Sequence, residues 1–156
     1  FIFSSFDGTP KSMLQVNYPS KKPSIAVKYG MDKIFCISRK KWVSLTPEEW
    51  VRQNFILFLS EVLKYPVSLI AVEKQIRLGP LKKRFDLIVF KDVEPFILIE
   101  CKEMGVPLTE NVLTQALSYY SQIQAKYLLI TNGNQTLAFQ KNGGKLTEAD
   151  EIPAFV

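Results

Sequence analysis

The stretch that decides the fold is "PFILIECKE", residues 95–103, in which an apolar run ends in Glu100, Cys101 and Lys102. A short apolar run bounded by polar residues is typical of a buried β-strand. Side chains two residues apart in a strand lie on the same face, so Glu100 and Lys102 are expected to point the same way, opposite to Cys101. The strand is therefore expected to end with a carboxylate and an ammonium group side by side.

A second carboxylate, Asp86, interrupts the upstream apolar run "RFDLIVF", residues 84–90. If the two runs form a hairpin around the turn "KDVE", Asp86 comes close to Glu100. Two carboxylates in an apolar setting raise each other's pKa unless a positive charge lies between them. Oxygen ligands of this kind suit Mg²⁺ or Mn²⁺, and Lys102 beside them is suited to orient or deprotonate a metal-bound water. The pattern is consistent with part of a metal-dependent phosphodiesterase site, although a surface Glu–Lys salt bridge remains the alternative.

The rest of the chain predicts an α/β (α+β) fold with a mixed central β-sheet flanked by helices. Thr46 is a suitable N-cap and Pro47 a suitable first residue for a helix that continues to about residue 64. A second helix is expected from Thr109 to about residue 124. Strands are expected at 24–29, 33–38, 71–78, 84–91, 95–102, 127–131 and 136–141. We expect an N-terminal arm and hairpin at 1–44, a core at 45–141 and a tail without secondary structure at 142–156.

Composition excludes several classes of enzyme. The 156-residue chain has no histidine, which excludes Ser-His-Asp and Cys-His catalysis and His-liganded zinc sites. Its two cysteines form no disulfide framework, and no apolar run is long enough to span a membrane, so we expect a cytoplasmic protein. A formal net charge of +5 favours an anionic partner such as nucleic acid.

Five segments in order resemble the PD-(D/E)XK nuclease superfamily, and more closely the N-terminal nuclease domain of type I restriction enzyme R subunits. They are "RKKWVSLTPEEWVRQNFILFL", "KRFDLIVF", "FILIECKE", "QALSYY" and "YLLITNG", within residues 36–140. One departure is Phe85, which stands where the motif nominally has proline. The resemblance implies a bacterial restriction-endonuclease-like core that hydrolyses DNA.

The resemblance also implies roles for matching residues. Asp86, Glu100 and the backbone carbonyl of Cys101 would ligate Mg²⁺ or Mn²⁺, and Lys102 would act on the attacking water. A glutamate of the first helix usually completes such a site, and here the choice lies between Glu48 and Glu49. Helical spacing places Glu48 on the apolar stripe expected to face the sheet, so we prefer Glu48.

Further residues are candidates for DNA contact. Gln115 and Tyr119 are four residues apart on the second predicted helix, and this pair resembles a motif of RecB-type nucleases that contacts DNA. Lys83 or Arg84, just before Asp86, could hold a phosphate near the metal. Two tryptophans, at positions 42 and 50, flank the start of the first helix, and we interpret them as packing residues rather than as base-stacking platforms.

The predicted function is Mg²⁺-dependent DNA hydrolysis, with two alternatives. One alternative is a nucleic-acid-binding module with the same fold and no catalysis, and the other is a partner-docking protein whose Glu100–Lys102 pair is structural. The sequence contains no G-x-x-x-x-G-K-[ST] motif, so we expect any motor or specificity function to come from separate subunits. The sequence predicts no membrane partner and does not specify an oligomeric state.

Overall fold

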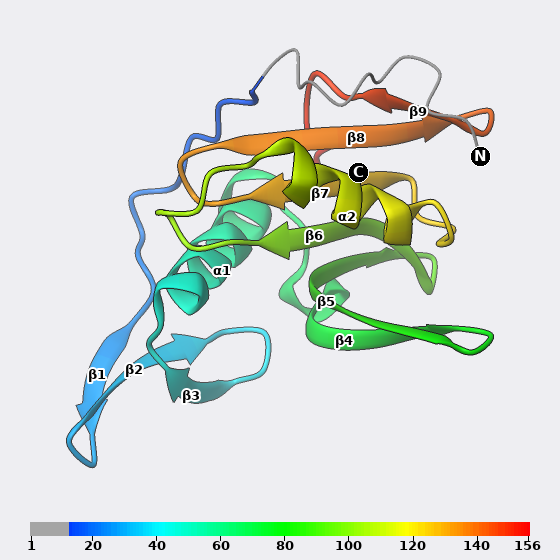
Figure 1. Ribbon diagram of the computed structural model, residues 1–156. Helices are drawn as coiled ribbons and strands as arrows, with labels where there is room; N and C mark the ends of the chain where they lie inside the picture. The colour runs from blue at the N-terminus through cyan, green and yellow to red at the C-terminus, as the bar shows by residue number, and fades with distance from the viewer. Residues whose placement is uncertain (1–12) are drawn as a thin grey trace.

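A six-stranded mixed sheet forms the centre of the molecule (Figure 1). The computed structural model describes residues 13–156, so the expectations for residues 1–12 lie outside the described part. The strand order is β4-β5-β6-β7-β8-β9, in which β6 and β7 are parallel and the other neighbours are antiparallel. The strands are β4 (Ile70–Leu78), β5 (Leu81–Lys91), β6 (Glu94–Cys101), β7 (Tyr127–Thr131), β8 (Thr136–Asn142) and β9 (Lys145–Glu148). The predicted mixed sheet is confirmed.

Helix α1 (Pro47–Leu57) covers one face of this sheet. It begins where predicted, because the Thr46 hydroxyl accepts a hydrogen bond from the Glu49 backbone N–H at 3.0 Å. The helix continues as a π-helical turn (Phe58–Val62), and a 3₁₀ turn (Val67–Leu69) then leads into β4. Buried apolar side chains of α1 pack against the sheet residues Leu87, Val89, Ile97, Ile99 and Leu129.

Helix α2 (Glu110–Tyr120) covers the opposite face and connects β6 to β7. Two strands that follow one another in the chain can pair in parallel only through such a crossover, so α2 allows β6 and β7 to lie parallel. Leu113, Leu117 and Tyr120 are buried against strand residues of that face. No helix within residues 13–156 is long and apolar enough to cross a membrane.

A separate three-stranded antiparallel sheet precedes α1 (Figure 1). It consists of β1 (Ile25–Lys28), β2 (Met31–Cys36) and β3 (Lys41–Ser44). The predicted hairpin corresponds to β1 and β2, whereas β3 was not predicted. Its four residues lie just before the Thr46 cap, so the sequence there indicates only the start of a helix. In the structure they form a strand, because Lys41 pairs with Cys36 across a short turn.

The C-terminal segment was predicted to contain no secondary structure, and this prediction was wrong. Strand β9 pairs antiparallel with β8 and extends the central sheet. The connection is the two-residue turn Gly143–Gly144, in which both residues have positive φ, 57° and 80°. Such a turn matches the twist of a hairpin, and a Gly-Gly pair is a strong signal for it.

Candidate active site

The β5–β6 hairpin brings Asp86 and Glu100 together. Leu87 is paired with Ile99, so the same register continued by one residue sets Asp86 opposite Glu100. Both carboxylates are largely buried, with side chains 17% and 13% exposed. Their proximity also has an electrostatic effect, because the negative charge of Asp86 contributes to a raised pKa of Glu100.

Asp86 is held in place by two strong hydrogen bonds. Its Oδ1 accepts from Arg52 Nη2 at 2.9 Å, and its Oδ2 accepts from the Cys101 backbone N–H at 2.7 Å. The first bond ties β5 to α1, and the second ties it to the end of β6. Hydrogen bonds to a charged group are about twice as strong as neutral ones, so Asp86 has little freedom to move.

Glu100 is buried but poorly compensated. Its Oε1 has no hydrogen-bond partner within residues 13–156, and the ammonium of Lys83 lies 3.9 Å from it. Burial, followed by the charge of Asp86, raises the pKa of Glu100 to about 7, while Lys83 and Lys102 act in the opposite direction. The arrangement leaves an acceptor oxygen that a further cation can satisfy.

The two glutamates of α1 have different surroundings. Glu49 is buried, and its carboxylate accepts hydrogen bonds from Arg52 Nη1 at 2.8 Å and Gln53 Nε2 at 3.0 Å. Glu48 is 49% exposed, contrary to the expected sheet-facing position. Burial and then the charge of Asp86 raise the pKa of Glu48, while Arg52 and Lys102 lower it, which places its carboxylate near the site. Glu48 is thus the glutamate of α1 that is near both Asp86 and Lys102.

Arg52 is a site residue that sequence reasoning missed. Its buried guanidinium contacts Asp86, Glu49 and Glu48, and Glu73 of β4 lies 3.8 Å from it. A signal was present in the sequence, because Arg52 lies three residues after Glu49 and four after Glu48 on the same predicted helix. Removing one partner of such a buried network leaves charges uncompensated, so the guanidinium is a major determinant of the site.

On the α2 side, a small cleft contains the candidate DNA-contacting residues. Glu100, Lys102 and Lys83 line it together with Gln115 and Tyr119. The Lys83 ammonium lies 5.0 Å from the centre of the Tyr119 ring, in the range of a cation–π interaction. The other basic candidate, Arg84, is exposed and does not line this cleft. The structure therefore brings Lys83, and not Arg84, to the candidate site.

The donor set of the site fits a hard divalent cation. Asp86, Glu100 and a backbone carbonyl supply oxygen, and Mg²⁺ typically uses one or two carboxylates and keeps several waters. In a strand the N–H and C=O of one residue point to the same side, so the Cys101 carbonyl points toward β5 as its N–H does. The unpartnered Glu100 Oε1 supports the fit. Among residues 13–156, however, no three His, Cys, Asp or Glu side chains already converge as a metal site.

Comparison with protein families gives a match over most of the chain. The profile described as the type I restriction enzyme R protein N terminus matches residues 47–153. The chain belongs to this family. No curated protein matches the chain. The R-protein N-terminal family is associated with restriction and modification and with nuclease-like domains, which confirms the resemblance stated from the sequence. The matched region contains every candidate site residue, from Glu48 of α1 to Tyr119 of α2.

Proposed function

We propose that this domain hydrolyses DNA phosphodiester bonds with the help of Mg²⁺ or Mn²⁺. The observation that carries the proposal is the Glu100 carboxylate, which is buried beside Asp86 and retains an oxygen without a hydrogen-bond partner. A carboxylate in this state is costly for the folded protein unless a cation binds it. Membership of the R-protein N-terminal family supports the nature of the reaction.

The proposed roles follow from the surroundings of each group. Asp86, Glu100 and the Cys101 carbonyl hold the cation, with Glu48 at the edge of the same site. Lys102 lines the cleft next to Glu100 and acts on the attacking water or on the phosphate charge. A bound Mg²⁺ lowers the pKa of water and offsets the negative charge that develops on the phosphate oxygens.

DNA contact is assigned to the α2 side of the site. Gln115, Tyr119 and Lys83 line the cleft beside Glu100, and Lys83 carries the positive charge suited to a phosphate. The basic net charge of the chain supports the same partner. ATP-driven translocation is not assigned to these 156 residues, because they contain no P-loop motif.

The proposal is tested by incubating single-stranded and double-stranded DNA with the protein in Mg²⁺, Mn²⁺ or EDTA. Cleavage is expected with the divalent ions and not in EDTA. Lys102→Ala should lower the rate by at least about 100-fold, since general acid–base groups typically contribute that much. Lys145→Ala, which removes the same charge from β9, is the matched control and should leave the rate unchanged. Equal rates for the two variants, with both folded, would refute the assignment.

A second candidate function is DNA binding without cleavage. The specific observation in its favour is Arg52, whose guanidinium already neutralises Asp86 at 2.9 Å. In such a binder the arginine replaces the metal, and divalent ions leave DNA affinity and thermal stability unchanged. Retained DNA binding together with no divalent-dependent cleavage in any buffer would favour this function over hydrolysis.

A further inference from the structure

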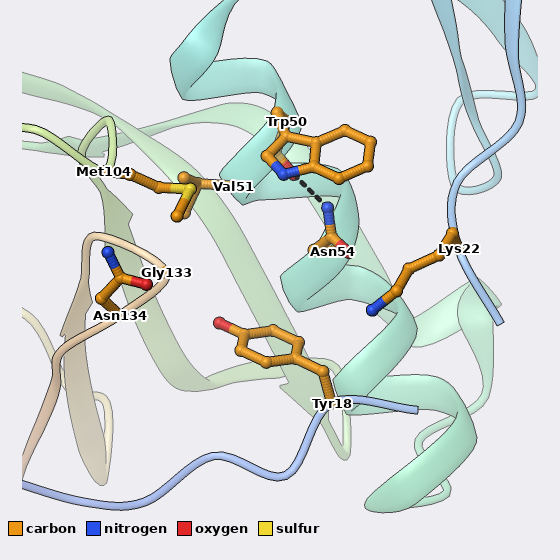
Figure 2. A pocket seen from close by; sticks show the side chains of 8 residues that line it. All are labelled: Tyr18, Lys22, Trp50, Val51, Asn54, Met104, Gly133 and Asn134. Carbon is orange, nitrogen blue, oxygen red and sulfur yellow. Dashed lines mark hydrogen bonds between the residues drawn. The ribbon is translucent and has the colours of Figure 1, made fainter. Parts of the chain in front are cut away.

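A second cavity lies beside α1 (Figure 2). It has a volume of about 190 Å³ and lies between the start of α1, the loop after β6, the β7–β8 turn and the N-terminal arm. Met104, on its wall, is two residues after Lys102, and Val51 precedes Arg52. The cavity is therefore separated from the candidate active site by a very short length of chain.

Polar groups line this cavity from several directions. The buried Tyr18 hydroxyl points into it and has no hydrogen-bond partner within residues 13–156. Thr131 is a neighbour of Tyr18, but its own hydroxyl already bonds Thr136 Oγ1 at 2.8 Å and the Gly133 N–H at 3.1 Å. Lys22 extends its ammonium group toward the cavity from the arm.

Amide side chains and one aromatic ring complete the lining. Asn54 lines the cavity and donates a side-chain N–H to the Trp50 backbone carbonyl at 2.8 Å. Its side-chain oxygen is the group that can accept a hydrogen bond from a ligand. Across the cavity, Asn134 contributes a second amide (Figure 2). The Trp50 indole forms part of the wall and provides an aromatic surface. The two amides provide hydrogen-bond donors and acceptors.

The turn at the far wall depends on a glycine. Gly133 has φ of 91°, and a Cβ there would lie 3.3 Å from side-chain atoms of both Met104 and Val51. The absence of a side chain lets the turn approach α1 and the β6 loop closely. This close approach closes one end of the cavity and holds Asn134 opposite the helix.

We propose that this cavity binds one unpaired nucleobase of a DNA strand. The base stacks on Trp50, its edge bonds the amides of Asn54 and Asn134, and Lys22 holds an adjacent phosphate. The volume corresponds to roughly six waters at ~30 Å³ each, which suits a single planar ring system and excludes a base pair. Stacking on an aromatic side chain is the common mode of single-strand binding, and a base stacked within a duplex cannot enter such a pocket.

This inference deepens the proposed function and rests on it only for the choice of DNA as ligand. It identifies unpaired DNA, such as a single strand or a frayed end, as the form of DNA that binds to the domain. It also gives Trp50 a role that differs from the packing role expected from the sequence.

The test uses Trp50 as its own reporter. The chain has two tryptophans, so the Trp42→Phe protein contains Trp50 alone. Trp42 is only partly buried and packs edge-on against Phe35 at 5.3 Å between ring centres, a contact that phenylalanine can retain. Titration with short single-stranded oligodeoxythymidine in EDTA should quench Trp50 fluorescence to saturation. The same oligonucleotide in a fully paired, blunt duplex should quench it much less.

Variants then locate the binding site. In the Trp42→Phe protein, Asn134→Leu and Lys22→Ala should each weaken binding of oligodeoxythymidine by about tenfold, the size expected for the loss of one hydrogen bond. Lys145→Ala is the matched charge control and should not change the affinity. If the Trp42→Phe protein does not fold, anisotropy of a labelled oligonucleotide with Trp50→Leu in the natural background replaces the fluorescence measurement.

Three results would overturn the inference. They are equal quenching by an oligonucleotide whose sugars lack bases, wild-type affinity of both cavity variants, and preference for the duplex. Because EDTA removes divalent ions, none of these results depends on cleavage. Loss of hydrolysis with retained single-strand quenching would refute the proposed function and leave the cavity assignment standing.

Discussion

Asp86 and Glu100 are carboxylates on adjacent strands, but their neighbours differ greatly. Asp86 accepts hydrogen bonds at both oxygens, from the Arg52 guanidinium and from the Cys101 N–H. Glu100 is similarly buried, yet one of its oxygens has no hydrogen-bond partner within the described part of the chain, and Lys83 lies 3.9 Å from it. On the α1 side the protein thus supplies a donor to each oxygen of Asp86, whereas on the α2 side it leaves Glu100 Oε1 without one.

This difference separates what the fold provides from what a ligand must provide. On the α1 side, the protein supplies its own cation and fixes the geometry of one carboxylate. On the α2 side, the protein tolerates an unfavourable charge, which is a common property of binding and catalytic sites. Stability should therefore respond in opposite directions to substitution of the two carboxylates.

The largest effect is expected for Arg52→Met. This change leaves Asp86 without its cation and Glu49 with Arg39 alone, at 3.4 Å, and breaking a buried ion pair in this way costs about 3–5 kcal/mol. Chemical denaturation should show this decrease in the free energy of unfolding. The exposed Arg77→Met on β4 is the control, with an expected change within about 0.5 kcal/mol. Similar values for the two variants would mean that Asp86 does not need its guanidinium partner.

The next largest effect is stabilisation by divalent ions. At a concentration 100 times the dissociation constant, a ligand that binds only the folded state adds about 2.7 kcal/mol to the free energy of unfolding. Thermal unfolding in Mg²⁺ or Mn²⁺ should therefore occur at a higher temperature than in EDTA. Glu100→Gln should abolish most of this shift. A shift of the same size in both proteins would place the cation elsewhere.

A direct comparison of the two carboxylates comes third. In EDTA, Asp86→Asn should lower the free energy of unfolding by about 1.5–3 kcal/mol, because it weakens a charged hydrogen bond to Arg52. Under the same conditions Glu100→Gln should raise it, on the order of 1 kcal/mol, because it removes an uncompensated buried charge. Equal signs for the two variants at pH 8 would contradict the asymmetry between the two sides.

A further expected effect is a pH dependence of stability in EDTA. The pKa of Glu100 is about 7 in the folded protein against an ordinary value of 4.5, so the folded state binds this proton more tightly than the unfolded state. The resulting stabilisation is fully present below about pH 4.5 and is lost as the pH rises through 7. Denaturation curves of Glu100→Gln should lack this loss. A wild-type curve that matches the variant between pH 5 and 8 would show that Glu100 is not perturbed.

Much of the fold could be predicted because its signals are local. The apolar runs at 84–91 and 95–102 and the Thr46–Pro47 cap each have a pattern that depends on few residues. Strand β9 could also have been predicted, since Gly143–Gly144 is a standard hairpin turn. Strand β3 could not, because four residues beside a helix cap carry too little periodicity.

The site was predictable where alternation along a strand determines which face a residue occupies. Glu100 and Lys102 share a cleft, as their spacing indicated. The spacing did not distinguish Lys83 from Arg84, because that choice depends on twist and on tertiary contacts. Helical spacing preferred Glu48 to Glu49 for a sheet-facing position that Glu48 does not occupy. Arg52 was missed although Glu48 and Glu49 precede it on the same helix, because its other partners, Glu73 and Asp86, come from strands far away in the sequence. Trp50 was interpreted as packing, and only the structure shows the cavity that it lines.

The loop after β6 has a consequence for the geometry of substrate handling. Lys102 lines the cleft and Met104 lines the cavity, and two residues of chain span at most about 7 Å. If the cleft hydrolyses DNA and the cavity binds a base, as proposed, this loop limits how far the scissile linkage can lie from the bound nucleotide. Lengthening it by one or two residues should move the cut along the strand by a defined step, so the product ends would report the loop length.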